Sequence, residues 1–121
     1  MNLGETFHST GHLWVVASLP DADGSVVMLS MTTHRPRCDE HCVIEAGEHP
    51  FVAHKTVMAY EKAIVFTVDQ QATANRLCRR YGPVSDELLA RIQRGACVSD
   101  LTPQKIVKAI RASMIKQAAR K

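Results

Sequence analysis

The sequence has no apolar run close to the roughly 20 residues that a helix needs to cross a bilayer, so we expect no membrane span. Its N-terminus, MNLGETFHSTGH, lacks a basic stretch followed by an apolar one, which predicts no secretory signal and a cytoplasmic location. Repeats and low-complexity tracts are also absent. At this length the chain is expected to form a single domain, residues 1–121.

Cysteines are few, and their spacing is not that of a disulfide scaffold. Cys38 and Cys42 are close together, whereas Cys78 and Cys97 stand singly within apolar helical patterns. In a reducing compartment the last two are expected to be small core residues. A chain of this length buries roughly two-thirds of its surface on folding, so neither a disulfide nor a metal is needed for stability.

Charge is distributed unevenly along the chain. Residues 1–71 carry 4 Lys/Arg against 9 Asp/Glu, whereas residues 72–121 carry 11 Lys/Arg against 3 Asp/Glu. A basic C-terminal half suits a surface that binds a polyanion such as nucleic acid. The alternative is that it neutralises the acidic half, within the chain or across a dimer.

The first half of the chain has β patterns. Runs rich in apolar and β-branched residues predict strands at residues 12–19, 25–33, 42–45 and 57–68. The linker PDADG at residues 20–24 has turn chemistry, which predicts a β-hairpin across residues 12–33. Short strands separated by polar turns are typical of a small barrel or a strongly bent sheet.

The second half of the chain is predicted to be helical, which gives an α+β fold that is mainly β with C-terminal helices. The first helical pattern includes Ala74, Leu77, Cys78 and Tyr81, and ends at Gly82 and Pro83. Ser85 is the expected N-cap of the next helix, with Leu88, Leu89, Ile92 and Ala96 facing inward and Gly95 near its exit. Thr102 and Pro103 are the expected N-cap and first residue of the last helix, which has an apolar stripe at Ile106, Val107, Ile110 and Met114. Lys105, Lys108 and Arg111 lie off that stripe and are the candidate nucleic-acid-binding residues.

Histidine and cysteine are crowded into residues 34–54, where four of the six histidines and two cysteines fall, and no histidine follows His54. Cys38, Cys42, His49 and His54 offer two thiolates and two imidazoles, enough for a tetrahedral zinc site, with His41 as a competing ligand. The alternative is that Cys42 is a buried strand residue and no metal binds. A cysteine nucleophile is a weaker interpretation, because neither cysteine has a recognisable local signature.

A second cluster favours proton transfer and phosphate binding. Thr32, Thr33, His34, Arg35 and Arg37 stand where the second predicted strand ends. Two arginines can clamp a phosphate, threonine can donate to a non-bridging oxygen, and histidine can act as a general acid or base. Together they would suffice for metal-free RNA cleavage, in which the 2′-OH attacks its own phosphodiester. Each residue also has a plainer interpretation, as a strand former or a solvated turn residue.

The segment HPFVAH at residues 49–54 adds two histidines that Pro50 and Phe51 would hold in place. Either His49 or His54 could instead cap backbone groups around a tight turn. We expect the fold to bring this turn face to face with the loop after residue 33, so that one polar pocket forms.

Three segments carry a family resemblance. GHLWVV at residues 11–16 resembles the opening Gly-Asp-Ile-Trp-x-Val strand of the MazF/PemK (Kid/CcdB-like) toxins. VVMLSMTT at residues 26–33 resembles their strand that ends in Pro-Ile-Thr-Ser, and residues 51–63 resemble their Asp-Gln-Val-Lys-x-Leu-Asp region. The resemblance covers about residues 11–68.

This resemblance implies an SH3-like β-barrel over about residues 8–70, single-stranded RNA cleavage, a homodimer and a cognate antitoxin. By position, Thr32 or Thr33 would take the place of the family's catalytic Ser/Thr. The chain departs from the family in residues 20–24, an acidic loop without the arginine that the family carries there. Arg35 or Arg37 would have to replace that arginine from a different loop, and the basic helical extension, residues 71–121, lies outside the resemblance.

The leading hypothesis is therefore a toxin-like, metal-independent endoribonuclease, or a degenerate relative, with RNA as its partner and no cofactor. In it His34, Arg35 and Arg37 bind and protonate the substrate, a threonine stabilises the phosphorane, and His49 or His54 supplies the base. One alternative is a non-enzymatic module that binds nucleic acid or protein through its helices. The other is a small zinc-stabilised interaction domain.

Overall fold

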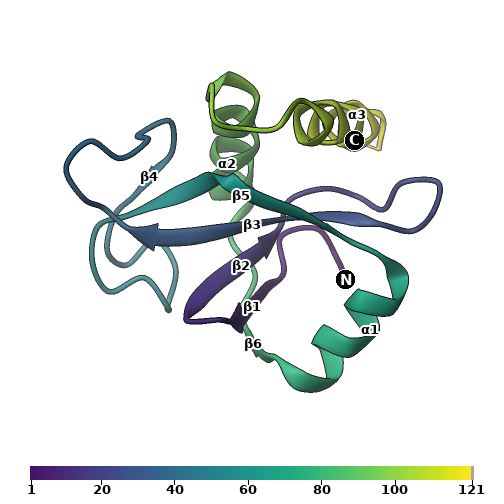
Figure 1. Ribbon diagram of the computed structural model, residues 1–121, viewed down its shortest axis with the longest axis horizontal. Coiled ribbons are helices and arrows are strands. Elements are labelled where there is room, and N and C mark those ends of the chain that lie inside the picture. Colours follow the sequence, from purple (N-terminus) through teal and green to yellow (C-terminus); the bar gives the residue numbers. More distant parts are fainter. Residues whose placement is uncertain (121) are drawn as a thin grey trace.

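The computed structural model describes residues 1–120 of the chain. Its elements are β1 (Thr6–Ser9), β2 (His12–Val16), β3 (Val26–Thr33), β4 (Val43–Ile44), β5 (Thr56–Phe66), α1 (Val68–Leu77), β6 (Arg79–Tyr81), α2 (Asp86–Val98) and α3 (Gln104–Ala119). The fold class is α+β, as the sequence predicts: a curled antiparallel half-barrel sheet with C-terminal helices. In Figure 1, α2 and α3 lie above the sheet and α1 lies below its right-hand end. None of the helices in residues 1–120 has both the length and the apolar character to cross a membrane.

The six strands are ordered β4-β5-β3-β2-β1-β6 and every pair is antiparallel. The predicted hairpin is present as β2 and β3, in which Trp14 pairs with Ser30. Between Met28 and Ser30 the register of β3 against β5 shifts, because residues 59–64 of β5 lie opposite only three residues of β3. Extra residues in one strand bend it and increase its twist, which explains why this sheet curls.

Apolar side chains fill both faces of the sheet. On the face toward α2 and α3, alternate residues of β2 and β3 form the larger core, because successive side chains of a strand point to opposite faces. Its fully buried members include Leu13, Val15, Leu29, Tyr60, Ile92, Ile106 and Ile110. The other face holds a smaller cluster around Phe7 and Met28, with α1 and Cys78 beside it. Cys78 and Cys97 pack against these clusters but are only partly buried, so they lie at the margin of the core and not inside it as expected.

The helix starts show which cap predictions hold. Ser85 caps α2 as predicted, since its hydroxyl accepts the Leu88 N–H at 3.1 Å. The prediction for α3 is wrong by one residue: Pro103 is the N-cap, and it offers no side-chain bond. The Thr102 hydroxyl is buried and, within residues 1–120, has no hydrogen-bond partner. Gly95 does not mark the exit of α2, which continues to Val98.

The structure differs most from the sequence prediction around residue 80. The helix predicted to reach Tyr81 ends at Leu77, and Arg79–Tyr81 forms the edge strand β6, paired with β1. The strand β1 was also not among the strands predicted from the sequence. The helix α1 starts earlier than predicted, after Thr67, because Thr67 and Gln70 form a reciprocal capping box.

Candidate active site

A pocket of about 390 Å³ opens at one end of the sheet. It is lined by residues 11–13, 31–33, 35, 51–54 and 56, so the turn after β1, the end of β3 and the loop before β5 all contribute. Thr32, Thr33, Arg35 and His54, all predicted site residues, are among them. The loop after β3 and the Pro-Phe turn therefore share one pocket, as we expected from the sequence.

Antiparallel pairing brings these loops together. Thr33 at the end of β3 pairs with Thr56 at the start of β5, and the His34 N–H donates to the Lys55 carbonyl at 3.0 Å. The side chains then meet: Thr33 Oγ1 lies 3.0 Å from His54 Nε2. Because a hydroxyl can either donate or accept, this contact can hold the imidazole in its neutral or its protonated form.

His12 is a pocket residue that the sequence analysis missed. It follows a tight turn at Thr10 and Gly11, whose φ values of 54° and 78° match the two left-handed positions of a type I′ hairpin. Its Nδ1 lies 3.0 Å from the Met31 carbonyl. A carbonyl only accepts, so Nδ1 carries the proton, and the neutral ring has its free lone pair on Nε2. The register of the predicted hairpin, which places residue 12 opposite residue 32, could have identified it.

The electrostatic character of the pocket favours an anion. Arg35 is exposed at its wall, and His12 and His54 can each carry a positive charge. None of the lining residues, all of which lie in the described part of the chain, carries a carboxylate. Guanidinium and imidazole groups without a compensating carboxylate are suited to binding phosphate.

Two of the predicted catalytic residues lie outside the pocket lining. His34 Nε2 pairs instead with Glu40 Oε2 at 2.8 Å, and the hydrogen bond from His34 holds the pKa of that carboxyl below its usual value. Arg37 is exposed in the following turn, with a left-handed φ of 66°.

His49 also lies outside the lining, because it is part of the core. Its side chain is buried, Nδ1 accepts the Phe51 N–H at 3.1 Å, and Nε2 donates to the Gly82 carbonyl. Both ring nitrogens are thus occupied. His49 ties the Pro-Phe turn to the segment after β6 and thereby positions the pocket wall that Phe51 and His54 form.

Replacing His49 with alanine is expected to lower stability through lost bonds and a cavity. The Phe51 N–H would lose its partner, and the Gly82 carbonyl would keep only the hydrogen bond from the Thr6 hydroxyl, at a cost of about 1–3 kcal/mol in the free energy of unfolding. Urea unfolding measures this cost, with exposed His54→Ala as the matched control, expected to change stability by less than about 0.5 kcal/mol. Equal stability of the two variants would show that His49 does not anchor the turn.

The geometry does not support the zinc alternative. Across residues 1–120, no group of three or more His, Cys, Asp or Glu side chains is placed to hold a metal ion. Both nitrogens of His49 are engaged, and burial raises the pKa of the Cys42 thiol, which disfavours the thiolate that zinc binds. The same raised pKa makes Cys42 a poor nucleophile.

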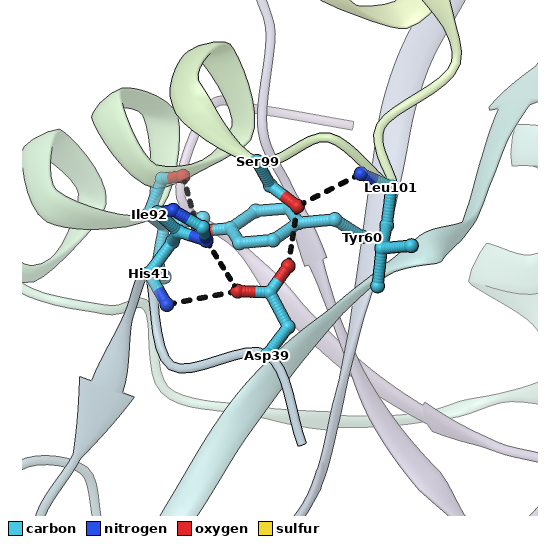
Figure 2. A network of polar contacts seen from close by, with 6 residues as sticks. All are labelled: Asp39, His41, Tyr60, Ile92, Ser99 and Leu101. Atoms are coloured by element: carbon cyan, nitrogen blue, oxygen red, sulfur yellow. Dashed lines mark hydrogen bonds and ion pairs between the residues drawn. The ribbon is translucent and has the colours of Figure 1, made fainter. Parts of the chain in front are cut away.

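A second polar cluster joins the loop before β4 to the end of α2 (Figure 2). Asp39 accepts three hydrogen bonds: from the His41 N–H at 2.8 Å, from the His41 ring at 2.7 Å and from the Ser99 hydroxyl. Its composition is that of a serine-hydrolase triad, but its order is not, because the carboxylate stands between the serine and the histidine. The imidazole therefore cannot take the serine proton, and the cluster serves to fasten the loop.

Asp39 makes stability dependent on pH. Burial would raise the pKa of Asp39, but the bonds from Ser99 and His41 outweigh it and hold that pKa below the ordinary 3.8. The ionised group therefore stabilises the fold above pH 4, and the contribution is lost as the pH falls through the lowered pKa.

Asp39→Asn is accordingly expected to cost about 1–3 kcal/mol at pH 7 and progressively less below pH 4. The measurement is urea unfolding at pH 7 and pH 2.5, with exposed Asp23→Asn as the control. A cost that stays constant over this range would contradict a role for the Asp39 charge.

The candidate nucleic-acid-binding residues are not brought to the pocket. Lys105, Lys108 and Arg111 are exposed on α3. Ser113 of that helix lies beside Val26 and Val27 at the start of β3, the end opposite Thr33, and its Oγ accepts the Leu19 N–H at 2.8 Å. The two features therefore define separate surfaces.

No protein-family model, no curated protein and no solved structure matches this chain.

Proposed function

We propose that the protein cleaves single-stranded RNA in the pocket at the end of β3, without a metal ion. The observation that carries this proposal is the pocket lining, where two imidazoles, one guanidinium and several threonine hydroxyls surround one space without a carboxylate. These groups are what a transfer of the phosphate to the neighbouring 2′-OH needs, since that reaction requires proton transfer and stabilisation of negative charge but no protein nucleophile.

The proposed reaction needs one base and one acid. The ribose 2′-OH loses its proton to a base and its oxygen attacks the adjacent phosphorus. The bond from phosphorus to the 5′ oxygen of the next nucleotide breaks, and an acid protonates that oxygen. The products are a 2′,3′-cyclic phosphate and a 5′-hydroxyl.

Each role has a candidate in the pocket. His12 is suited to be the base, because its Nδ1–H is fixed on the Met31 carbonyl and Nε2 has the free lone pair. His54, oriented by Thr33, is suited to be the acid. Arg35 would bind the non-bridging oxygens and stabilise the charge of the phosphorane. His12 thus replaces His49, which is buried, as the second imidazole.

The test is incubation of untagged protein with mixed single-stranded RNA in excess EDTA over pH 5–8, followed by end-group analysis. We expect fragments with 2′,3′-cyclic phosphate and 5′-hydroxyl ends. RNA that stays intact over this range would refute the proposal.

A non-enzymatic nucleic-acid-binding module is the second candidate, and one observation favours it. The helix α3 has no acidic residue and exposes Lys105, Lys108 and Arg111. Salt-sensitive RNA binding without cleavage, lost when these three are replaced, would support this candidate instead. The antitoxin and the homodimer that the toxin resemblance implies stay predictions.

A further inference from the structure

Aromatic residues make up only 5% of the chain, yet two of them meet a histidine beside the pocket. The ring centroids of Phe51 and Tyr81 are 4.9 Å apart, and that of His8 lies 5.6 Å from Phe51 and 6.3 Å from Tyr81. The three side chains come from β1, from the edge strand β6 and from the Pro-Phe turn. Phe51 is 37% exposed, although aromatic side chains bury large apolar areas when the core has room for them.

A cation completes this cluster. The Arg79 guanidinium lies 5.0 Å from the centroid of the Tyr81 ring. Its neighbour Arg80 is paired with Glu5 at 3.2 Å, whereas Arg79 forms no ion pair with any carboxylate in residues 1–120. The charge of Arg79 is thus available to a phosphate next to the rings.

The cluster adjoins the pocket through Phe51. This side chain lines the pocket on one side and contacts the rings of His8 and Tyr81 on the other. A strand with its scissile phosphate beside Arg35 and His54 would therefore have an adjacent nucleotide within reach of Phe51.

We propose that Phe51, Tyr81, His8 and Arg79 form a stacking subsite for an unpaired base of single-stranded RNA. Aromatic side chains that flank a basic groove bind bases of any sequence, because every base has a π face. The phosphate of the stacked nucleotide contacts Arg79. The assignment of this base to the nucleotide next to the scissile phosphate rests on the function proposed above, whereas the binding of the base does not.

The test uses a single-stranded 2′-O-methyl oligonucleotide, which cannot be cleaved by attack of its own 2′-OH, with affinity measured by fluorescence anisotropy. Phe51→Ala and Phe51→Leu are both expected to weaken binding by about 5- to 150-fold, because the subsite needs a ring and not merely apolar bulk. Phe51→Trp is expected to bind the oligonucleotide with an affinity within about 3-fold of that of the wild-type protein. Arg79→Ala should make the slope of log affinity against log salt concentration shallower by the amount that one phosphate contact contributes.

Matched controls separate stacking from folding. Val98→Ala removes another exposed apolar side chain, 62% exposed at the end of α2, and should leave the affinity unchanged. The thermal midpoint of each Phe51 variant is measured in parallel. An oligonucleotide with a row of abasic residues should bind the wild-type protein and Phe51→Ala equally.

The two proposals fail in different ways. If Phe51→Leu binds the 2′-O-methyl oligonucleotide as well as Phe51→Trp does, the stacking subsite is overturned, whether or not RNA is cleaved. If the wild-type protein leaves RNA intact but the Phe51 variants lose affinity in the expected order, the subsite is supported and the nuclease proposal is refuted.

Discussion

Alanine at His12, Arg35 or His54 is expected to reduce RNA cleavage in EDTA by at least about 100-fold, because general acid–base catalysis contributes roughly 10²–10⁴-fold. The three side chains line one pocket and come from separate segments of the chain. The exposed His54 and Arg35 make few packing contacts, so their replacement should leave the thermal midpoint nearly unchanged. The measurement is the initial rate of fragment formation from a labelled RNA.

The chain supplies matched controls for this prediction. His34 and Arg37 have the same side chains and stand within two residues of Arg35, but they lie outside the pocket lining. His34→Ala and Arg37→Ala are expected to keep the cleavage rate within about 3-fold of the wild-type rate. This change is far smaller than the loss expected when a general acid or base is removed. Loss of cleavage in these controls, or its retention in the pocket variants, would place the chemistry elsewhere.

Gly95→Ala is expected to destabilise the protein by about 1–3 kcal/mol, the usual cost of overpacking a core. Glycine to alanine within a helix normally stabilises by roughly 0.5–1 kcal/mol, so the sign is reversed here. The reason is contact: a Cβ at Gly95 would lie 2.2 Å from the Tyr60 hydroxyl and 2.9 Å from the His41 carbonyl. Tyr60 cannot easily move, since its hydroxyl donates to the Ile92 carbonyl at 2.8 Å (Figure 2).

Urea unfolding measures the effect of Gly95→Ala, and Gly82→Ala is the control. A Cβ at Gly82 would meet nothing within 4 Å, so its replacement should change stability by less than about 1 kcal/mol. The double variant Gly95→Ala, Tyr60→Phe should cost less than the sum of the single variants, because the hydroxyl that the Cβ meets is gone. Additive costs would show that Tyr60 is not the obstacle.

The elements with strong local patterns could be predicted from the sequence. The β2–β3 hairpin and the start of α2 follow from alternation, turn chemistry and capping within a few residues. The shared pocket follows too, because antiparallel pairing of β3 and β5 puts the end of one beside the start of the other. Four of the seven predicted catalytic residues line it: Thr32, Thr33, Arg35 and His54.

The remaining features depend on contacts between distant segments, which a local pattern does not reveal. Arg79–Tyr81 became a strand because β1, more than 70 residues earlier, offers it an edge. His49 is held in the core by the Gly82 carbonyl, 33 residues away. The position of His12 in the pocket depends on strand register. The predicted catalytic residues all fell within residues 32–54, because most of the histidines lie there.

The central claim, that the pocket at the end of β3 binds the RNA backbone, is tested most directly by an NMR titration. The wild-type protein, labelled with ¹⁵N, is titrated with the 2′-O-methyl oligonucleotide, and shifts are followed at backbone amides and imidazole nitrogens. Our account predicts the largest shift changes at His12, Thr33, Arg35 and His54. Changes confined to residues 105–111 of α3, with none at the pocket, would contradict it.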